Sequence, residues 1–171
     1  MQESSNIKDS EKIISLLSRM PMLKMFDKHQ LGQMLQYTKI FVYDFGDTII
    51  EEGQADQTIF ILISGTTYVL KNGVYLGEFN TVGDIFGEMS VIDGSVRSAS
   101  VVAQGRTICL AIDASFIEHA GNSEQTMLCQ NILFRAFSGL LAERLRAMNT
   151  ENIRLRKELE ELKTSKGGRC V

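Results

Sequence analysis

The stretch of sequence that most constrains the fold lies between Ile40 and Ile112, where short β-rich runs alternate with glycine-containing turns. The runs, rich in β-branched and aromatic residues, are Thr48–Ile50, Thr58–Ile63, Thr66–Leu70, Val74–Phe79, Ala99–Ala103 and Thr107–Ile112. Many short strands with regular turns predict an antiparallel sandwich or barrel. The pair Asn72-Gly73 is a strong hairpin signal, because both central residues of such a turn need a positive φ.

Helical patterns flank this β region. Before it, apolar residues recur at helical spacing in two groups, Ile13, Ile14, Leu16, Leu17 and Met20, then Leu31, Met34, Leu35 and Tyr37. After it, residues 113–163 lack proline and read as helix, with a possible break at Gly121-Asn122. The sequence therefore predicts N-terminal helices over residues 1–40, a β core over 41–113, C-terminal helices over 114–163 and a flexible tail over 164–171.

The composition narrows the class of protein. With 171 residues the chain can form one domain plus an appendage, and its net charge of −3 argues against a general attraction to nucleic acid. Its apolar runs are too short to cross a bilayer, and its polar N-terminus does not resemble a signal peptide. Cys109, Cys129 and Cys170 have no metal-ligand spacing, so we expect no metal and plain packing roles for Cys109 and Cys129. We expect a cytoplasmic protein.

The segment Gly83 to Ala103 carries the most chemistry. A buried anion such as a small cyclic phosphodiester needs a paired cation or several hydrogen-bond donors. Arg97 offers a permanent charge and a planar fork of donors, and Gly87 permits a close approach of the backbone. Ser98 and Ala99 add backbone amides, and free N–H groups would also be available if a helical turn opens at Glu88. The Glu88 carboxylate can accept hydrogen bonds from a ribose hydroxyl and balance the arginine. Together these groups suit a ribose cyclic monophosphate.

At these residues the chain resembles the cyclic nucleotide-binding domain family, over about residues 15–145. The similarity lies in Pro21-Met22-Leu23, in the Glu52-Gly53 turn, in Phe60 to Gly65, and in a phosphate-binding cassette made of Gly83, Phe86-Gly87-Glu88 and Arg97-Ser98-Ala99-Ser100. The resemblance implies a mainly β fold, a jelly-roll β-roll (a double-stranded β-helix) with flanking helices. It implies that Glu88 binds the ribose 2′-hydroxyl and Arg97 an exocyclic phosphate oxygen. The expected contact set is Phe86, Gly87, Glu88, Met89, Arg97, Ser98 and Ala99.

The identity of the base is less constrained. In the family a hydroxyl residue after the cassette arginine often accompanies guanine, and Ser98 stands there, but bacterial cAMP receptors also carry serine at that place. We expect cAMP rather than cGMP. Asn149 and Thr150 lie where activator-type members place base-contacting polar residues. The alternative for both is a solvated helix face.

A heptad pattern marks the last helical stretch. Apolar residues, interrupted by one asparagine, recur alternately four and three residues apart at Leu141, Leu145, Met148, Asn152, Leu155, Leu159 and Leu162. Such a pattern predicts a coiled-coil seam, in which a lone asparagine favours an in-register pair. In a parallel dimer, Glu151 would face Arg156 of the second copy and Glu158 would face Lys163. The alternative is an amphipathic helix packed on its own domain.

These observations lead to a dimeric sensor in which the ligand repositions the C-terminal helix and a downstream protein receives the signal. Three alternatives stay open: a cGMP-specific sensor domain of a larger assembly, a structural dimer without a ligand, and a truncated activator-type transcription factor. Only a short tail follows Leu162, so we expect no direct binding of nucleic acid, and nothing indicates a membrane. The β region offers no nucleophile elbow and no metal cluster. We therefore expect no enzyme, no catalytic residue and no cofactor beyond the ligand.

Overall fold

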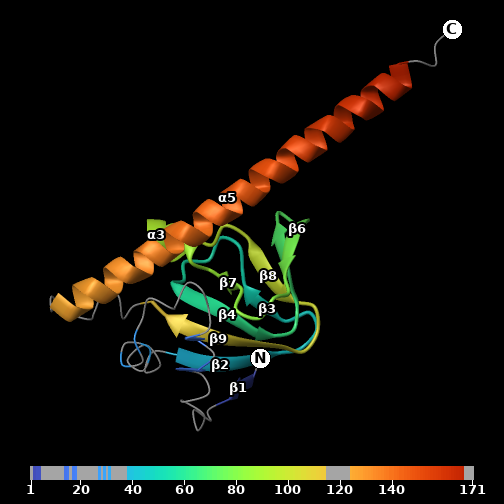
Figure 1. Cartoon of the computed structure of the whole chain (residues 1–171). Coiled ribbons are helices and arrows are strands. Elements are labelled where there is room, and N and C mark those ends of the chain that lie inside the picture. Colours follow the sequence, from blue (N-terminus) through green and yellow to red (C-terminus); the bar gives the residue numbers. More distant parts are fainter. Residues whose placement is uncertain are drawn as a thin grey trace. The chain divides into compact units, whose positions relative to one another are not determined.

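The computed structural model describes residues 2–4, 14–15, 17–18, 27, 29, 31, 38–114 and 124–167. Within them the chain forms nine strands, one short helix and one long helix (Figure 1). The strands are β1 (Gln2–Ser4), β2 (Thr38–Tyr43), β3 (Thr48–Ile50), β4 (Thr58–Ser64), β5 (Thr67–Lys71), β6 (Val74–Phe79), β7 (Ile85–Phe86), β8 (Ser100–Ala103) and β9 (Thr107–Asp113). The helices are α3 (Met89–Asp93) and α5 (Glu124–Gly167).

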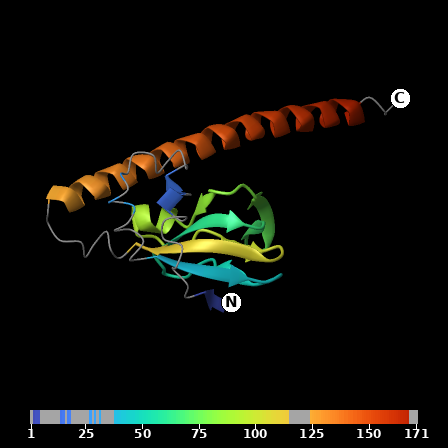
Figure 2. The same ribbon diagram turned by 60° about the horizontal axis from the view of Figure 1, so that its bottom comes forward.

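The strands form two antiparallel sheets, which confirms the predicted β-roll. One sheet has the order β1-β2-β9-β4-β7 and the other the order β3-β8-β5-β6. Strands far apart in the chain are neighbours, as β2 and β9 are in Figure 2. The same holds for β3 and β8, which brings the turn after β3 beside the chain that leads into β8. This arrangement places the turn after β3 beside the predicted cassette residue Arg97.

An apolar cluster of residues from both sheets forms the core. Its buried members are Tyr43, Ile50, Phe60, Leu62, Phe86, Val101, Ala103, Cys109 and Ala111. The ring of Phe86 stacks on Phe60, with centroids 5.5 Å apart, and on Phe79, with centroids 5.0 Å apart. Burial raises the pKa of the Cys109 thiol to about 12. A fully buried, protonated thiol behaves as a small apolar side chain, so the packing role predicted for Cys109 is confirmed.

All six predicted strands are confirmed. The six runs read from the sequence correspond to β3, β4, β5, β6, β8 and β9, with ends that agree within one residue. The hairpin turn is also as predicted, because Asn72 has φ 49° and Gly73 has φ 76°. Three strands were not among these runs: β1, β2 and β7. β2 begins at Thr38, inside the region 1–40 that was expected to be helical, because its residues pair with β9. β7 has two residues, too few to show a period, and β1 is polar and becomes a strand only by pairing with the edge of β2.

The N-terminal region differs from the expected run of helices. Gln2–Ser4 form a strand rather than a helix, because the free edge of β2 supplies their backbone partners. Helical conformation is found at Ile14, Leu17 and Leu31, and both leucines are fully buried. The rest of the two predicted helices lies mostly outside the described residues, as does the possible break at Gly121-Asn122.

The helix α5 continues beyond the predicted boundary at Lys163. It includes residues 164–167 of the expected flexible tail, where the Thr164 hydroxyl donates to the carbonyl oxygens of Glu160 (3.1 Å) and Glu161 (2.8 Å). The polar composition of this segment gave no apolar pattern from which a helix could be predicted. In the structure, the threonine hydroxyl bonds back to the preceding turn of the helix. The chain divides into two compact units, Met1–Phe134 and Arg135–Val171. Among the described residues, no helix is long and apolar enough to span a membrane.

Candidate functional site

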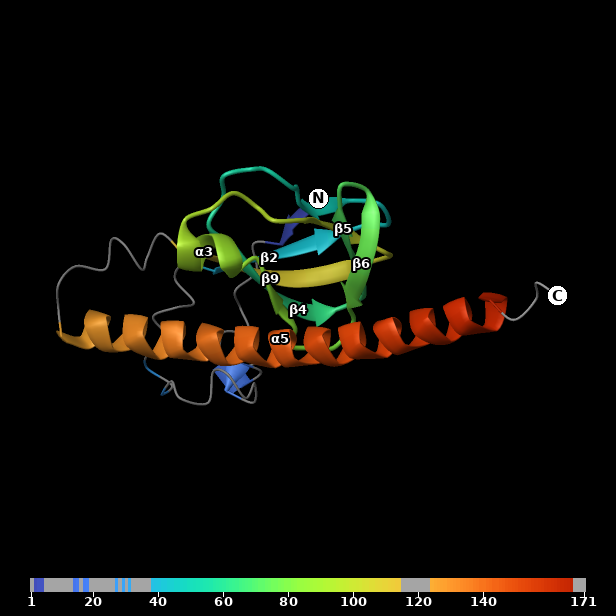
Figure 3. The ribbon, with the colours of Figure 1, turned by 90° about the horizontal axis from the view of Figure 1, so that it is seen from above.

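The predicted cassette consists of a strand, a short helix and the loop of residues 94–99 that leads back to β8, which we name the return loop. β7 ends at Phe86, Glu88 is the N-cap of α3, and Gly94 ends the helix in the left-handed conformation. Figure 3 shows α3 at one end of the β-roll and the β5–β6 hairpin at the other. The return loop is held to the turn after β3, because the Arg97 N–H donates to the Gln54 carbonyl and the Gly53 N–H donates to the Arg97 carbonyl, both at 2.9 Å.

Gly87 permits the close approach that the sequence indicated. Its φ is +84°, a conformation that residues with a side chain rarely adopt. A Cβ atom at this position would lie 2.8 Å from Nη1 of Arg97 and 2.8 Å from the Thr58 carbonyl oxygen. Only glycine therefore fits between the arginine and strand β4 without a shift of the surrounding atoms.

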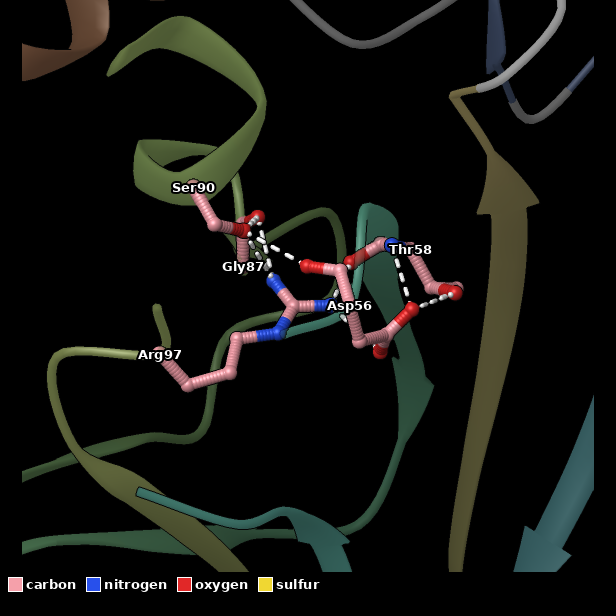
Figure 4. Close-up of polar contacts among 5 residues, drawn as sticks. All are labelled: Asp56, Thr58, Gly87, Ser90 and Arg97. Atoms are coloured by element: carbon pink, nitrogen blue, oxygen red, sulfur yellow. Dashed lines mark hydrogen bonds and ion pairs between the residues drawn. The ribbon is translucent and has the colours of Figure 1, made fainter. Parts of the chain in front are cut away.

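Arg97 is the centre of the polar network (Figure 4). Its side chain is almost completely buried. Nη1 donates to the Gly87 carbonyl (2.6 Å) and to the Ser90 hydroxyl (2.9 Å). Nη2 donates to the Thr58 carbonyl (2.6 Å) and to Oδ2 of Asp56 (2.7 Å). Strand β4, the cassette glycine and α3 thus hold one guanidinium in a fixed orientation.

The Nε atom of Arg97 differs from the two terminal nitrogens. A guanidinium carries five N–H donors, and the four bonds above can use all those on Nη1 and Nη2. Nε is buried and has no hydrogen-bond partner among the described residues. A buried donor without a partner costs about 1–3 kcal/mol. An anion that accepts from Nε would remove this cost, and the positive charge would favour it.

Asp56 is a site residue that the sequence analysis missed. Its Oδ1 accepts hydrogen bonds from the Thr58 N–H (3.0 Å) and the Thr58 hydroxyl (2.8 Å), while Oδ2 pairs with Arg97. Partial burial raises the pKa of this carboxyl, but the hydrogen bonds from Arg97 and Thr58 outweigh that effect and lower the pKa overall. The sequence signal was the Asp-x-Thr spacing before a strand, typical of a local side-chain turn. It does not reveal a partner 41 residues away.

The other predicted contact residues differ in where their side chains lie. The Phe86 ring is in the core, so only its backbone can serve a ligand. Glu88 is 1% exposed, whereas Met89 is 45% exposed. The Ser98 hydroxyl, which is exposed, lies 3.7 Å from the Met89 sulfur, and Ala99 is half-buried. The cassette residues therefore gather around α3 and its return loop, with Arg97 and Glu88 inside.

The predicted base-contacting residues and dimer seam belong to the second unit. Asn149 and Thr150 are exposed, and the Thr150 hydroxyl donates to the Arg146 carbonyl of its own helix (3.0 Å). Five of the seam side chains are about half exposed or more: Leu145, Met148, Leu155, Leu159 and Leu162. Asn152 is exposed and Leu141 is half-buried. Glu151 and Glu158 both pair with Arg154 of the same helix, at 3.0 and 3.4 Å.

Comparison with known proteins points to one family. Residues 40–123 match the model of the cyclic nucleotide-binding domain. The chain is 32% identical over 114 residues to the cAMP-dependent protein kinase regulatory subunit of Schizosaccharomyces pombe, covering 66% of this chain and 28% of that protein. It is 29% identical over 132 residues to human cGMP-dependent protein kinase 2, covering 73% of this chain and 17% of the kinase. The chain thus spans less than a third of either curated relative.

The fold of a solved structure agrees. A cyclic nucleotide-binding domain from Methylobacillus flagellatus superposes with a TM-score of 0.71, covering 86% of this chain and 84% of that one. At 21% identity this likeness concerns the fold alone. The matched residues 40–123 include the strands from Ile40 of β2 to β9, together with Asp56, Gly87 and Arg97. The chain therefore belongs, through residues 40–123, to the cyclic nucleotide-binding domain family.

Proposed function

We propose that this chain binds a cyclic nucleotide monophosphate, with cAMP preferred over cGMP, and acts as a dimeric regulatory module. The observation that carries the proposal is the buried Arg97, whose four terminal N–H bonds fix its orientation while Nε has no protein partner among the described residues. A cation built into a β-roll in this way costs stability unless a negative charge compensates it, and Asp56 compensates it only from a half-exposed position.

In the proposed complex the phosphate accepts from Arg97 and from backbone amides near Gly87 and Ala99. Glu88 accepts from the ribose 2′-hydroxyl. A ligand without the ribose hydroxyl would lose this bond, so the site would select for a ribose as well as for the phosphate. Asp56 acts as a positioning residue, because it holds one side of the guanidinium that the phosphate would contact.

The choice of base stays a proposal. The S. pombe relative is named for dependence on cAMP and the human relative for dependence on cGMP, so the two similarities support different bases. Ser98 is compatible with either. We propose cAMP, with Asn149 or Thr150 as candidate contacts to the base. A cGMP-specific domain is the second candidate, and the human relative favours it.

The second half of the proposal is a homodimer through α5. The exposed seam residues would be buried by a second copy, at about 25 cal/mol for each Å² of apolar surface. A change in the preferred arrangement of α5 on ligand binding would pass the signal to a downstream protein, provided that the ligand has different affinities for the two arrangements. We propose signalling rather than catalysis. A cytoplasmic location stays a prediction from the sequence.

Calorimetric titration of the protein with cAMP and with cGMP tests the binding half. Heat of binding and a raised melting temperature are expected with both, and a lower dissociation constant with cAMP. Absence of heat and of a thermal shift with either nucleotide at high micromolar concentration would reject the function and favour a structural dimer.

Light scattering tests the dimer, for which we expect twice the mass of one chain. Asn152→Leu should broaden the distribution of oligomers, since the buried amide of a paired asparagine specifies a two-stranded register. A strictly dimeric mass in this variant would count against the seam.

A further inference from the structure

The turn of the β5–β6 hairpin lies against the return loop of the cassette. Lys71, the last residue of β5, donates a hydrogen bond from Nζ to the Ser98 carbonyl oxygen at 2.7 Å. Ser98 directly follows the cassette arginine. A lysine from another hairpin therefore holds the backbone at the point where the loop turns towards β8.

Glu52 joins this contact from the turn after β3. Its Oε1 lies 3.7 Å from Nζ of Lys71, and its Oε2 accepts a hydrogen bond from the Asn72 N–H at 2.8 Å. The Glu52 N–H in turn donates to the Ser100 hydroxyl at 2.9 Å. Lys71 and Glu52 thus connect three segments, the β3 turn, the hairpin turn and residues 98–100. We name these two residues the brace.

The position of the Ser98 oxygen has a geometric consequence. The Ser98 carbonyl and the Ala99 N–H belong to one planar peptide unit, and in a trans unit they point in opposite directions. When Lys71 holds the oxygen on one side, the Ala99 N–H must point to the other side. Ala99 is one of the residues whose amide we expect to hold the phosphate.

We infer that Lys71 is a positioning residue for the ligand: by holding the Ser98 carbonyl, with Glu52 in support, it aims the Ala99 amide at the cyclic phosphate. The inference rests on the proposed function and deepens it. It assigns to the β5–β6 hairpin a part in ligand affinity without any contact between Lys71 and the ligand. A loop whose Ala99 N–H already points towards the phosphate position loses less conformational freedom on binding, and the ligand therefore binds more tightly.

The test compares Lys71→Met, which removes the ammonium and keeps a long apolar stem, with Lys71→Arg, which restores a cationic donor. Lys39→Met, on β2 of the other sheet, is the matched loss of one charge. Calorimetry with cAMP should show an affinity about three- to tenfold weaker for Lys71→Met, the range expected for a half-exposed charged hydrogen bond. Lys71→Arg should recover most of the affinity, and Lys39→Met should equal the unmodified protein.

A variant of Glu52 separates positioning from simple attraction. If Lys71 acted only as a positive charge near an anion, Glu52→Ala would remove an opposing negative charge and tighten binding. If the brace positions the loop, Glu52→Ala weakens binding, by about two- to fivefold given that the pair is partly exposed. Tighter binding in Glu52→Ala would overturn the inference, as would unchanged binding in Lys71→Met.

A readout without ligand distinguishes this inference from the proposed function. In the nucleotide-free protein, the amide resonance of Ala99 should shift and its hydrogen exchange should speed up in Lys71→Met, while amides of β9 stay as they are. If the unmodified protein binds no nucleotide, the proposed function fails. An unchanged Ala99 amide in Lys71→Met means that the brace does not position the loop, whatever the unmodified protein binds.

Discussion

The two compact units of this chain treat charge and apolar surface in opposite ways. In the β-roll, Arg97, which is 4% exposed, is surrounded by acceptors, and the rings of Phe60 and Phe86 stack inside. In the unit Arg135–Val171, charged residues pair on the helix surface and leucines such as Leu155 and Leu162 are exposed. The first unit surrounds the two terminal nitrogens of that guanidinium with its own acceptors and leaves Nε without a partner among the described residues. The second presents a face that a single copy leaves in water.

This difference separates the two proposed functions, ligand binding and dimerisation. A buried, oriented cation is a feature of a ligand site, because its orientation is settled before the ligand arrives. An exposed heptad is a feature of assembly, because its apolar side chains gain free energy only against a partner. If the contrast holds, changes in one unit should alter nucleotide affinity, and changes in the other should alter mass.

The largest effect is expected from Arg97→Ala. It removes the buried counter-charge, so nucleotide affinity should fall by at least about 30-fold, the lower end for loss of one partner of a buried charged pair. Arg154→Ala, which breaks two surface pairs on α5, is the matched control and should bind normally. Calorimetry measures both. Arg97→Lys covers the case in which the alanine variant does not fold, and normal binding by a folded variant would place the phosphate elsewhere.

The second largest effect is expected from a substitution that disrupts the coiled-coil seam. Leu155→Asp introduces a charge at a core heptad position, and the dimer should dissociate at least about tenfold more readily, as for a buried unpaired charge. The control is Ile153→Asp, because Ile153 is equally apolar and 58% exposed but lies off the seam. Sedimentation should report monomers for Leu155→Asp and dimers for Ile153→Asp. Equal masses for the two variants would reject the seam.

Alanine substitutions at two glycines distinguish the energetic cost of backbone strain from the cost of close packing. Gly87→Ala meets both a positive φ and atoms 2.8 Å away, whereas Gly94→Ala meets a positive φ and open space. We expect Gly94→Ala to lower the free energy of unfolding by about 1–2 kcal/mol from strain alone. Gly87→Ala should add about 1–3 kcal/mol for overpacking. Denaturant unfolding measures both, and equal losses would mean that the cassette yields to the added methyl group.

The smallest expected effect is on the stability of the fold at acidic pH. The lowered pKa of Asp56 means that its pairing stabilises the fold above the unfolded value of about 4 and that this contribution is lost as pH falls below it. Asp56→Asn lacks this contribution at every pH. The stability of the two proteins should therefore differ at pH 7 and converge below about pH 4. A constant difference across this range in urea unfolding would show that the pKa of Asp56 is the same in the folded and unfolded states.

The β-roll was largely predictable because its information is local. Each of the six predicted strands has its own β-rich run, and the β5–β6 hairpin has its own turn signal at Asn72-Gly73. The cassette residues Gly87 and Arg97 could be named for the same reason, since a glycine without a Cβ and a cationic guanidinium are specific residue types and the two are close in sequence. β1 and β7 could not be predicted. Their conformation comes from neighbouring strands rather than from their own residues.

Asp56 and Lys71 mark the limit of prediction at the site itself. Both are ordinary surface residue types in turn-like contexts, and nothing near them in the chain indicates a role. Their partners are 41 and 27 residues away. The antiparallel pairing of β3 with β8 and of β5 with β8 brings those partners within reach.

The sequence by itself thus determined the β-roll, the hairpin, the cassette and the heptad, because each rests on a short-range pattern of residue type and spacing. Only the tertiary structure decided that Arg97 is held by Asp56 and the Thr58 carbonyl, and that Lys71 holds the Ser98 carbonyl. The physical reason is that hydrogen bonds act over about 3 Å. Which groups come that close across two sheets depends on the register of every strand between them.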